Sequence, residues 1–240
     1  STLTSYGANS TLVGGAGTSV LIASGAGDVL LGGSGQNTLT ALGSNETLTG
    51  GSGTSTLVGN VNGNTLKAGT GTTVASYSAN NLALNLVNGT ASVSGGTVSD
   101  QLVGITRAIV SGNNNQLTTP GGGTLEVVQG SGNILIANGA GAVLRSDSGS
   151  NTLEALNGGD TLFGGSGADI LQGGGNDDVL TAGSGANTLI AYGSASTLTA
   201  GSGADVLTSS GQNDVLIAGG GNSTLTSYGA NSTLVGGAGT

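Results

Sequence analysis

The side chains that most enzymes use for catalysis are scarce in this sequence. It contains no histidine and no cysteine, and its 12 acidic residues are spread along a sequence repeat instead of forming a cluster. Asp177 and Asp178 are adjacent, but neighbouring residues of an extended chain point to opposite faces, so they do not form a general acid/base pair. Arg107 is expected to be a solvated or acid-paired surface residue. We therefore predict no catalytic residue and no enzymatic activity.

The charge balance argues against several classes of partner. The formal net charge is −9, and only Lys67, Arg107 and Arg145 are basic. A chain without a basic patch has little electrostatic attraction for nucleic acid or for an anionic membrane. No run of about 18 apolar residues is present, so we predict no transmembrane segment. With 51 glycines, one phenylalanine and no tryptophan, the chain is too poor in large apolar residues for a single large core.

A leucine recurs at every ninth residue over 1–72 and again over 133–240. These leucines are Leu3, Leu12, Leu21, Leu30, Leu39, Leu48, Leu57, Leu66, Leu135, Leu144, Leu153, Leu162, Leu171, Leu180, Leu189, Leu198, Leu207, Leu216, Leu225 and Leu234. Each unit begins with a polar residue, which is followed by Thr or Val, then by Leu, and then by a variable residue. A loop rich in Gly and Ser completes the unit. This period fits a short strand and a tight turn. We expect the leucines to point inward and their neighbours outward.

Two such units make one coil of a flattened solenoid. The sequence therefore predicts an all-β fold, a parallel β-roll or β-solenoid with about 18 residues per coil. Glycines such as Gly14, Gly15 and Gly17 are expected to supply the positive φ angles of the turns. Polar residues at the first position of the units are expected to stack in hydrogen-bonded ladders, among them Asn151, Asn187 and Ser196.

A second, longer repeat indicates how the chain is organised. The segment STLTSYGANSTLVGGAGT occurs at 1–18 and again, identically, at 223–240, which indicates a tandem repeat whose first copy spans 1–222. If residues 73–132 form three coils of about 20 residues, one repeat holds roughly 12 coils and rises roughly 58 Å. The predicted divisions are a regular solenoid at 1–72, irregular coils at 73–132, a second regular solenoid at 133–222 and the start of the next repeat at 223–240.

Several segments resemble the repeats-in-toxin (RTX) family, whose nonapeptide is G-G-x-G-x-D-x-Leu-x. The nonapeptide matches are GGSGADILQ at 164–172, GGGNDDVLT at 173–181 and AGSGADVLT at 200–208. The irregular stretch resembles the segment that accompanies these repeats, with Ser76 and Tyr77 on one strand, then a Leu-x-Leu-x-x-Gly strand, then Asp-x-Leu-x-Gly-Ile from Asp100 to Ile105. The resemblance covers nearly the whole chain.

In the RTX family the Asp side chains and the loop carbonyls of adjacent coils bind calcium, an ion that takes six to eight oxygen ligands. The resemblance therefore implies calcium as an optional ligand, and the candidate metal ligands are Asp160, Asp169, Asp178, Asp205 and Asp214. Residues on the same side of the solenoid are separated by two nonapeptides in the sequence. Paired carboxylates are consequently expected at Asp160 with Asp178 and at Asp28 with Glu46.

The first half of the chain departs from the family pattern. At the Asp position it carries Ser or Asn, except at Asp28 and Glu46; the replacements are Ser10, Ser19, Asn37, Ser55 and Asn64. We therefore expect a fold that requires no cofactor and has no cofactor-binding residues, with Asn, Ser and Thr hydrogen bonds in place of the metal in many coils.

The function that these features favour is structural. RTX proteins are bacterial and exported, so the resemblance implies a secreted protein, extracellular or at the cell surface. The tandem repeat favours a segment of a long filament, sheath, surface layer or matrix fibre, with other copies of itself as partners, end to end and laterally. The alternative is an extender, or stalk, of a large RTX-type adhesin. Outward Thr-x-Thr pairs also suggest ice binding, but STLTS, SVLIA, NTLTA and STLVG interrupt the Thr array on one face.

Overall fold

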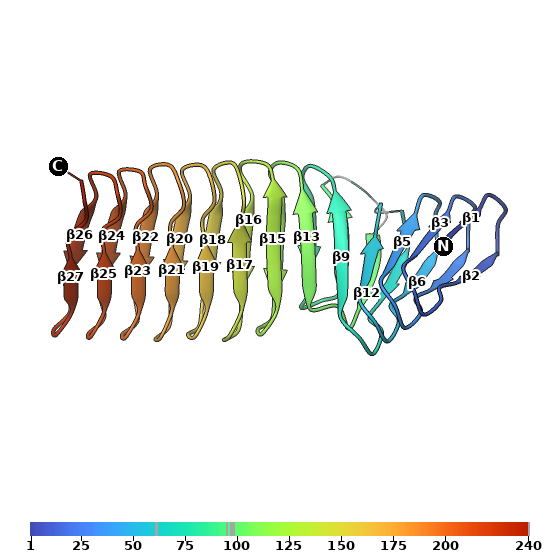
Figure 1. Cartoon of the computed structure of the whole chain (residues 1–240), viewed down its shortest axis with the longest axis horizontal. Helices are drawn as coiled ribbons and strands as arrows, with labels where there is room; N and C mark the ends of the chain where they lie inside the picture. Colours follow the sequence, from blue (N-terminus) through green and yellow to red (C-terminus); the bar gives the residue numbers. More distant parts are fainter. Residues whose placement is uncertain (61, 95, 97–98, 240) are drawn as a thin grey trace. The chain divides into compact units, whose positions relative to one another are not determined.

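The computed structural model describes residues 1–60, 62–94, 96 and 99–239. The described residues form 27 β-strands and no helix, so they contain no helix that could cross a membrane. The chain divides into two compact units, Ser1–Val110 and Ser111–Thr240. The all-β prediction is confirmed, and each unit is described below by itself (Figure 1).

The first unit is a parallel solenoid whose strands alternate between two sheets. One sheet contains β1 (Thr2–Ser5), β3 (Ser19–Ala23), β5 (Asn37–Ala41), β7 (Ser55–Val58) and β9 (Thr73–Ser78). The other contains β2 (Thr11–Val13), β4 (Val29–Leu31), β6 (Thr47–Thr49) and β8 (Thr65–Lys67), followed in space by β12 (Ser99–Val103), β11 (Thr90–Val93) and β10 (Leu82–Asn85). Strand β13 (Arg107–Ser111) spans the division between the units.

The second unit has the same parallel architecture. One sheet contains β14 (Gln116–Thr119), β16 (Ile134–Ala137), β18 (Thr152–Ala155), β20 (Ile170–Gly173), β22 (Thr188–Ala191), β24 (Val206–Ser209) and β26 (Thr224–Ser227). The other contains β15 (Thr124–Gln129), β17 (Val143–Ser146), β19 (Thr161–Phe163), β21 (Val179–Thr181), β23 (Thr197–Thr199), β25 (Val215–Ile217) and β27 (Thr233–Val235).

The periodic leucines form the core of each unit, as predicted. In the regular regions each strand pairs in parallel with the strand one coil later, and the register places equivalent residues side by side, so that Leu162 lies beside Leu180. Most of these leucines are completely buried, whereas the residues flanking them in the strands are partly exposed. A coil therefore contributes a leucine from each sheet to a narrow core, and stability comes from stacking one coil on the next.

The turn glycines have two roles, of which only one was predicted. Gly14, Gly15 and Gly17 do not have positive φ angles, but other turn glycines such as Gly27 and Gly63 do, as do some asparagines such as Asn9. Many turn glycines lie against the backbone of the preceding coil. A Cβ atom on Gly165, for example, would collide with the carbonyl oxygens of Asp147 and Ser146. Close stacking of successive turns is thus what excludes larger residues there.

The irregular stretch differs from the three successive coils that we expected. Within the first unit, β10 pairs antiparallel with β11, β11 pairs antiparallel with β12, and β12 pairs in parallel with β8. The chain thus makes a three-stranded meander between β9 and β13. A buried hydrogen bond of 2.9 Å from Tyr77 Oη to Asp100 Oδ2 joins β9 to this meander, and Asp100 Oδ1 accepts the backbone N–H groups of Asn62 and Asn64.

Candidate metal centre

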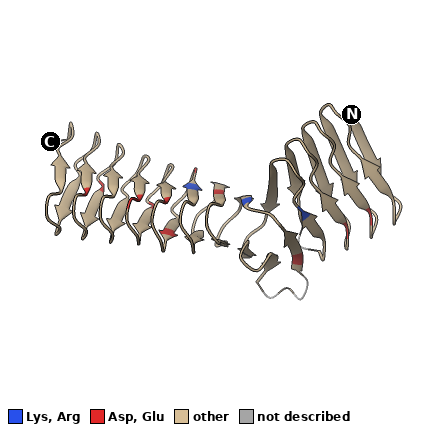
Figure 2. Ribbon diagram, turned by 90° about the horizontal axis from the view of Figure 1, so that it is seen from below, with Lys and Arg blue, Asp and Glu red and all other residues tan. Residues whose placement is uncertain are grey.

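The five candidate aspartates all stand directly before the Thr/Val/Ile-Leu pair that begins a strand of the second unit. Each is at most 1% exposed. Figure 2 shows how few charged residues the chain has and how the acids recur from coil to coil. The aspartates form two rows: Asp160, Asp178 and Asp214 precede β19, β21 and β25, whereas Asp169 and Asp205 precede β20 and β24. The described part of the chain has no group of three metal-binding side chains.

One carboxylate oxygen of every candidate has the same kind of partner. Oδ1 accepts the backbone N–H of the residue at the same place in the preceding coil. The donors are Ala142 for Asp160 (2.6 Å), Asn151 for Asp169 (2.8 Å), Asp160 for Asp178 (3.0 Å), Asn187 for Asp205 (2.8 Å) and Ser196 for Asp214 (2.9 Å). These bonds satisfy a buried donor in each coil, whether or not the side chain is charged.

Asparagine and serine make the same bond in the coils that lack aspartate. In the sheet that contains β14 to β26, an unbroken ladder joins the residues at this position from Asn115 to Ser223 through Asn133, Asn151, Asp169, Asn187 and Asp205. The predicted polar ladders are therefore present. Their main bond runs from backbone N–H to side-chain oxygen, with additional side-chain pairs such as Asn133 Nδ2 to Asn151 Oδ1 at 2.9 Å.

The second carboxylate oxygen distinguishes the candidates from one another. Oδ2 of Asp160, Asp169, Asp178 and Asp214 is buried without a hydrogen-bond partner. In Asp205 the corresponding oxygen accepts the N–H of Gly201 at 2.8 Å. A buried anionic oxygen without a donor is costly, because it has lost its water and gained nothing in exchange. Turn amides such as those of Gly165 and Gly175 lower the pKa of Asp169 and Asp178, but less than burial raises it. A proton or a cation would therefore stabilise these buried carboxylates.

The asparagines show what faces this second oxygen. Where asparagine replaces aspartate, its Nδ2 donates to the carbonyl oxygen two residues earlier: Asn37 to Gly35 at 2.9 Å, Asn151 to Gly149 at 3.2 Å and Asn187 to Gly185 at 3.1 Å. Aspartate has an oxygen in place of this NH₂ group. Its Oδ2 cannot donate to that carbonyl oxygen, and a cation bound in the turn would contact both oxygens.

Two glycines leave space beside two of these oxygens. A Cβ atom on Gly164 would lie 3.2 Å from Asp169 Oδ2, and one on Gly173 would lie 2.6 Å from Asp178 Oδ2. The corresponding residue five positions before Asp160 is Ala155. Asp169 and Asp178 belong to GGSGADILQ and GGGNDDVLT, two of the segments that resemble the RTX nonapeptide. They are thus the best candidates for calcium ligands.

Burial makes these carboxyl groups difficult to ionise. Desolvation raises the pKa of Asp169, and it raises the pKa of Asp178 to about 6, with a further contribution from the nearby carboxylates of Asp160 and Asp177. Burial also raises the pKa of Asp160 above its usual value. A cation in the turn would favour the charged form and reverse these shifts.

The two expected carboxylate pairs are both present. Asp160 donates its backbone N–H to Asp178, and each has a second oxygen without a partner. In the first unit Asp28 and Glu46 are buried, and each also has one unpartnered oxygen. Burial first, and then repulsion from Asp28, raise the pKa of Glu46 to about 7. The prediction that acids one coil apart interact thus holds in both units.

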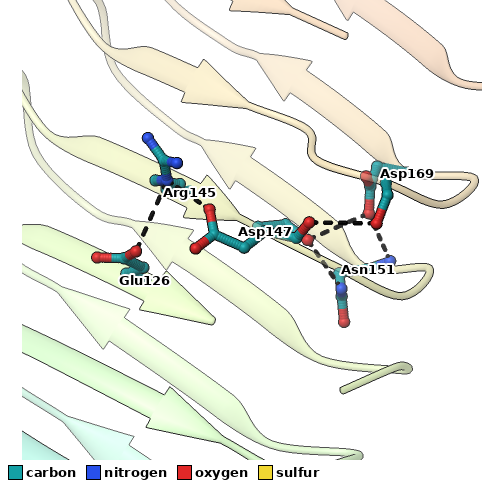
Figure 3. A network of polar contacts seen from close by, with 7 residues as sticks. Glu126, Arg145, Asp147, Asn151 and Asp169 are labelled. Atoms are coloured by element: carbon teal, nitrogen blue, oxygen red, sulfur yellow. Dashed lines mark hydrogen bonds and ion pairs between the residues drawn. The ribbon is translucent and has the colours of Figure 1, made fainter. Parts of the chain in front are cut away.

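Figure 3 shows the surroundings of Asp169. Its Oδ1 also accepts a long hydrogen bond from Ser146 Oγ at 3.4 Å, and the Asn151 side chain donates to Ser146 Oγ at 2.9 Å. Beside this buried group, the exposed guanidinium of Arg145 lies 2.5 Å from Asp147 and 3.6 Å from Glu126. Arg145 is thereby held on the surface, and its pKa is raised by Asp147.

The oxygen ligands available in the second unit fit calcium. Asp169 and Asp178 would each supply one carboxylate oxygen, and the carbonyl groups of the turns that precede them would supply neutral oxygens, as a hard cation requires. When bound, calcium would supply the positive charge that these buried oxygens lack. Sequence reasoning identified the aspartates but missed the contribution of Gly164 and Gly173, although the paired glycines of both segments were a visible signal.

Comparison with known families agrees with this geometry. The model of the RTX calcium-binding nonapeptide repeat matches residues 6–39, 22–57, 40–73, 145–180, 154–189, 181–216 and 190–225, which together cover more than half of the chain. No curated protein matches the sequence. RTX repeats bind calcium and occur in secreted bacterial proteins. The matched repeats, the parallel solenoid that they form and the buried aspartates show that the chain belongs to the RTX calcium-binding nonapeptide repeat family.

Proposed function

We propose that this chain is a structural repeat of a long extracellular bacterial protein whose tandem copies build a filament, sheath, surface layer or matrix fibre. The observation that carries the proposal is the ladder from Asn115 to Ser223, in which each coil satisfies a buried backbone donor of the coil before it. Such a ladder holds the coils together through ordinary side chains, so the solenoid keeps its order where no metal is bound.

Two further features support a scaffold over a catalyst. The buried acids accept hydrogen bonds from backbone N–H groups of neighbouring coils. Among the described residues they are not gathered into groups of three or more. The identity between 1–18 and 223–240 supports tandem copies whose coils continue one into the next. In this proposal calcium strengthens the coils around Asp169 and Asp178 and is dispensable elsewhere.

Electron microscopy of a protein carrying several successive copies of the repeat tests the proposal. We expect long regular assemblies in the presence of a calcium chelator, with an axial rise of roughly 60 Å per repeat at about 4.8 Å per strand. Because β1 lies in one sheet and its copy β26 in the other, the same face is expected to recur at every second repeat. Separate rods that never associate would favour the stalk of an adhesin instead. Particles without any axial period, or a loss of the far-ultraviolet β signal on addition of chelator, would refute the metal-independent scaffold.

A further inference from the structure

From β18 to β26, one edge of the second unit carries alternating large and small side chains; the residues that precede them on this edge are Pro120 and Asn138. We call it the alternating ridge, and define it as the residues that directly follow β18, β20, β22, β24 and β26: Leu156, Gly174, Tyr192, Ser210 and Tyr228. All five are exposed; Leu156 is 51% exposed, Tyr192 54% and Tyr228 77%. Exposed large side chains in a regular row are unusual on a soluble surface and indicate an interaction site.

The backbone holds the ridge at a fixed spacing. Each ridge residue donates its N–H to the last strand residue of the preceding coil, with N to O distances of 2.8–3.0 Å from Leu156 to Tyr228. Successive ridge residues are therefore one strand spacing, about 4.8 Å, apart, and the large side chains are about 9.6 Å apart. Gly174 and Ser210 each leave a gap of one coil between two large side chains.

The same alternation occurs in the first unit. Tyr6, Ser24 and Leu42 directly follow β1, β3 and β5; Tyr6 is 84% exposed and Leu42 is 59% exposed. Of the four tyrosines in the chain, Tyr192 and Tyr228 are ridge residues, Tyr6 has the equivalent position in the first unit, and Tyr77 is buried. Because residues 223–240 repeat 1–18, Tyr228 corresponds to Tyr6, and in a tandem protein the ridge would continue from Tyr228 through the equivalents of Ser24 and Leu42.

We propose that the alternating ridge is a lateral contact between two copies of this chain, which pair antiparallel with the large side chains of one ridge in the gaps of the other. A two-fold axis between the coils of Tyr192 and Ser210 places Tyr192 opposite Ser210 of the partner and Tyr228 opposite Gly174 of the partner. Both pairs then occur twice, as an isologous interface requires.

Charge and shape favour a second copy as the occupant. Most of the acids that give the chain its net charge of −9 are buried, so little charge on the described surface opposes the approach of another copy. The ridge residues are uncharged, and the residues after them are Asn157, Gly175, Gly193, Gly211 and Gly229. The small flanking glycines let the ridges approach, and the Ser210 hydroxyl can hydrogen-bond the Tyr192 hydroxyl of the partner. Each contact is small, but tandem repeats multiply it along the fibre.

This inference rests on the proposed function and adds the surface that joins the fibres side by side. Sedimentation equilibrium of the whole chain over a wide concentration range tests it. Y192S removes a large side chain, and S210Y fills a gap. We expect both to weaken dimerisation by about tenfold or more, because a two-fold contact loses each pairing twice. S202Y, the same exchange at an exposed turn outside the ridge, should leave dimerisation unchanged.

The S210Y variant separates specific pairing from general stickiness. If the edge associates only through non-specific hydrophobic contacts, the added tyrosine should strengthen association, and this result would overturn the ridge contact. A wild-type chain that remains monomeric at every concentration would overturn it as well. Circular dichroism of each variant reports whether the fold is intact. If S210Y repeats still assemble side by side with the expected axial period, the ridge is refuted but the scaffold stands; if wild-type repeats form no rods, the proposed function itself fails.

Discussion

The exchange D178N is expected to stabilise the protein in the absence of calcium, although it alters a fully buried polar residue. Asp178 Oδ1 accepts the N–H of Asp160, and an amide oxygen can keep that bond. The second oxygen has no partner. An amide NH₂ in its place would donate to the turn, as Asn187 does to Gly185.

The pKa of Asp178 sets the size of this effect. Burial and nearby carboxylates raise the pKa from 3.8 to about 6, which corresponds to about 3 kcal/mol at 1.36 kcal/mol per pKa unit. Solvent relaxation around the turn reduces this to about 1–2 kcal/mol. Because the folded-state pKa lies above the unfolded one, the wild-type carboxyl contributes fully below about pH 4, and its contribution is lost as the pH rises to about 6.

Thermal unfolding followed by circular dichroism in chelator measures the effect. At pH 7.5 D178N should unfold at a higher temperature than the wild type, by about 2–4 °C per kcal/mol, and the difference should disappear near pH 4. Calcium should stabilise the wild type more than the variant, because it binds the folded carboxylate. D177N is the matched control, since it removes an exposed charge from the adjacent residue.

A different outcome would refute the reasoning about the turn. If D178N lowered the unfolding temperature equally at pH 4 and pH 7.5, burial of the Asp178 carboxylate would not destabilise the fold. If D177N reproduced the whole effect, net charge would explain it, and the local geometry of Asp178 would carry no weight.

Three further exchanges test other parts of the structure. G165V should cost more than about 3 kcal/mol or abolish folding, because its side chain would meet the carbonyls of the preceding coil, whereas T161A on the partly exposed face should cost less than about 1 kcal/mol; urea unfolding compares them. Y77F should cost about 1–3 kcal/mol by removing a donor from the buried Asp100, again in urea, and an unchanged midpoint would contradict that role. Because the pKa of Glu46 is raised to about 7, the wild-type protein should lose stability as the pH rises from about 4.5 to 7. E46Q should reduce this loss, which would appear as a flatter dependence of unfolding temperature on pH.

Much of the fold could be predicted because the nine-residue period is strictly kept. One leucine per unit fixes which face of each strand is buried, and the length of a coil follows once two units face each other, as the pairing of Leu162 with Leu180 shows. The meander between β9 and β13 could not be predicted in the same way. Its antiparallel pairing depends on contacts such as Tyr77 with Asp100, which are distant in sequence and follow no period.

The candidate site was predicted in its positions but not in its details. The register identified all five aspartates, since a repeat places equivalent side chains equivalently. It could not show that Gly201 donates to the second oxygen of Asp205 at 2.8 Å whereas Oδ2 of Asp169 has no hydrogen bond of comparable geometry. That difference depends on the backbone conformation of each turn, which a glycine-rich sequence does not determine because glycine adopts many φ and ψ angles. The stacking role of turn glycines such as Gly165 was missed for the same reason, because contacts between coils cannot be seen in a single unit.

The bonds of the buried ladder from Asn115 to Ser223 all point one way. Each polar side chain of the ladder after Asn115 accepts a hydrogen bond from the backbone N–H one coil before it, as Asn133 does from Asn115, so the bonds of a coil are completed by the coil that follows it. The ladder is therefore polar, because the N–H at this position of each coil is bonded only when the next coil is in place. A chain synthesised from its N-terminus can add coils in this order. Shortening it from the C-terminus by whole coils should expose only one such donor per sheet, whatever the length that remains.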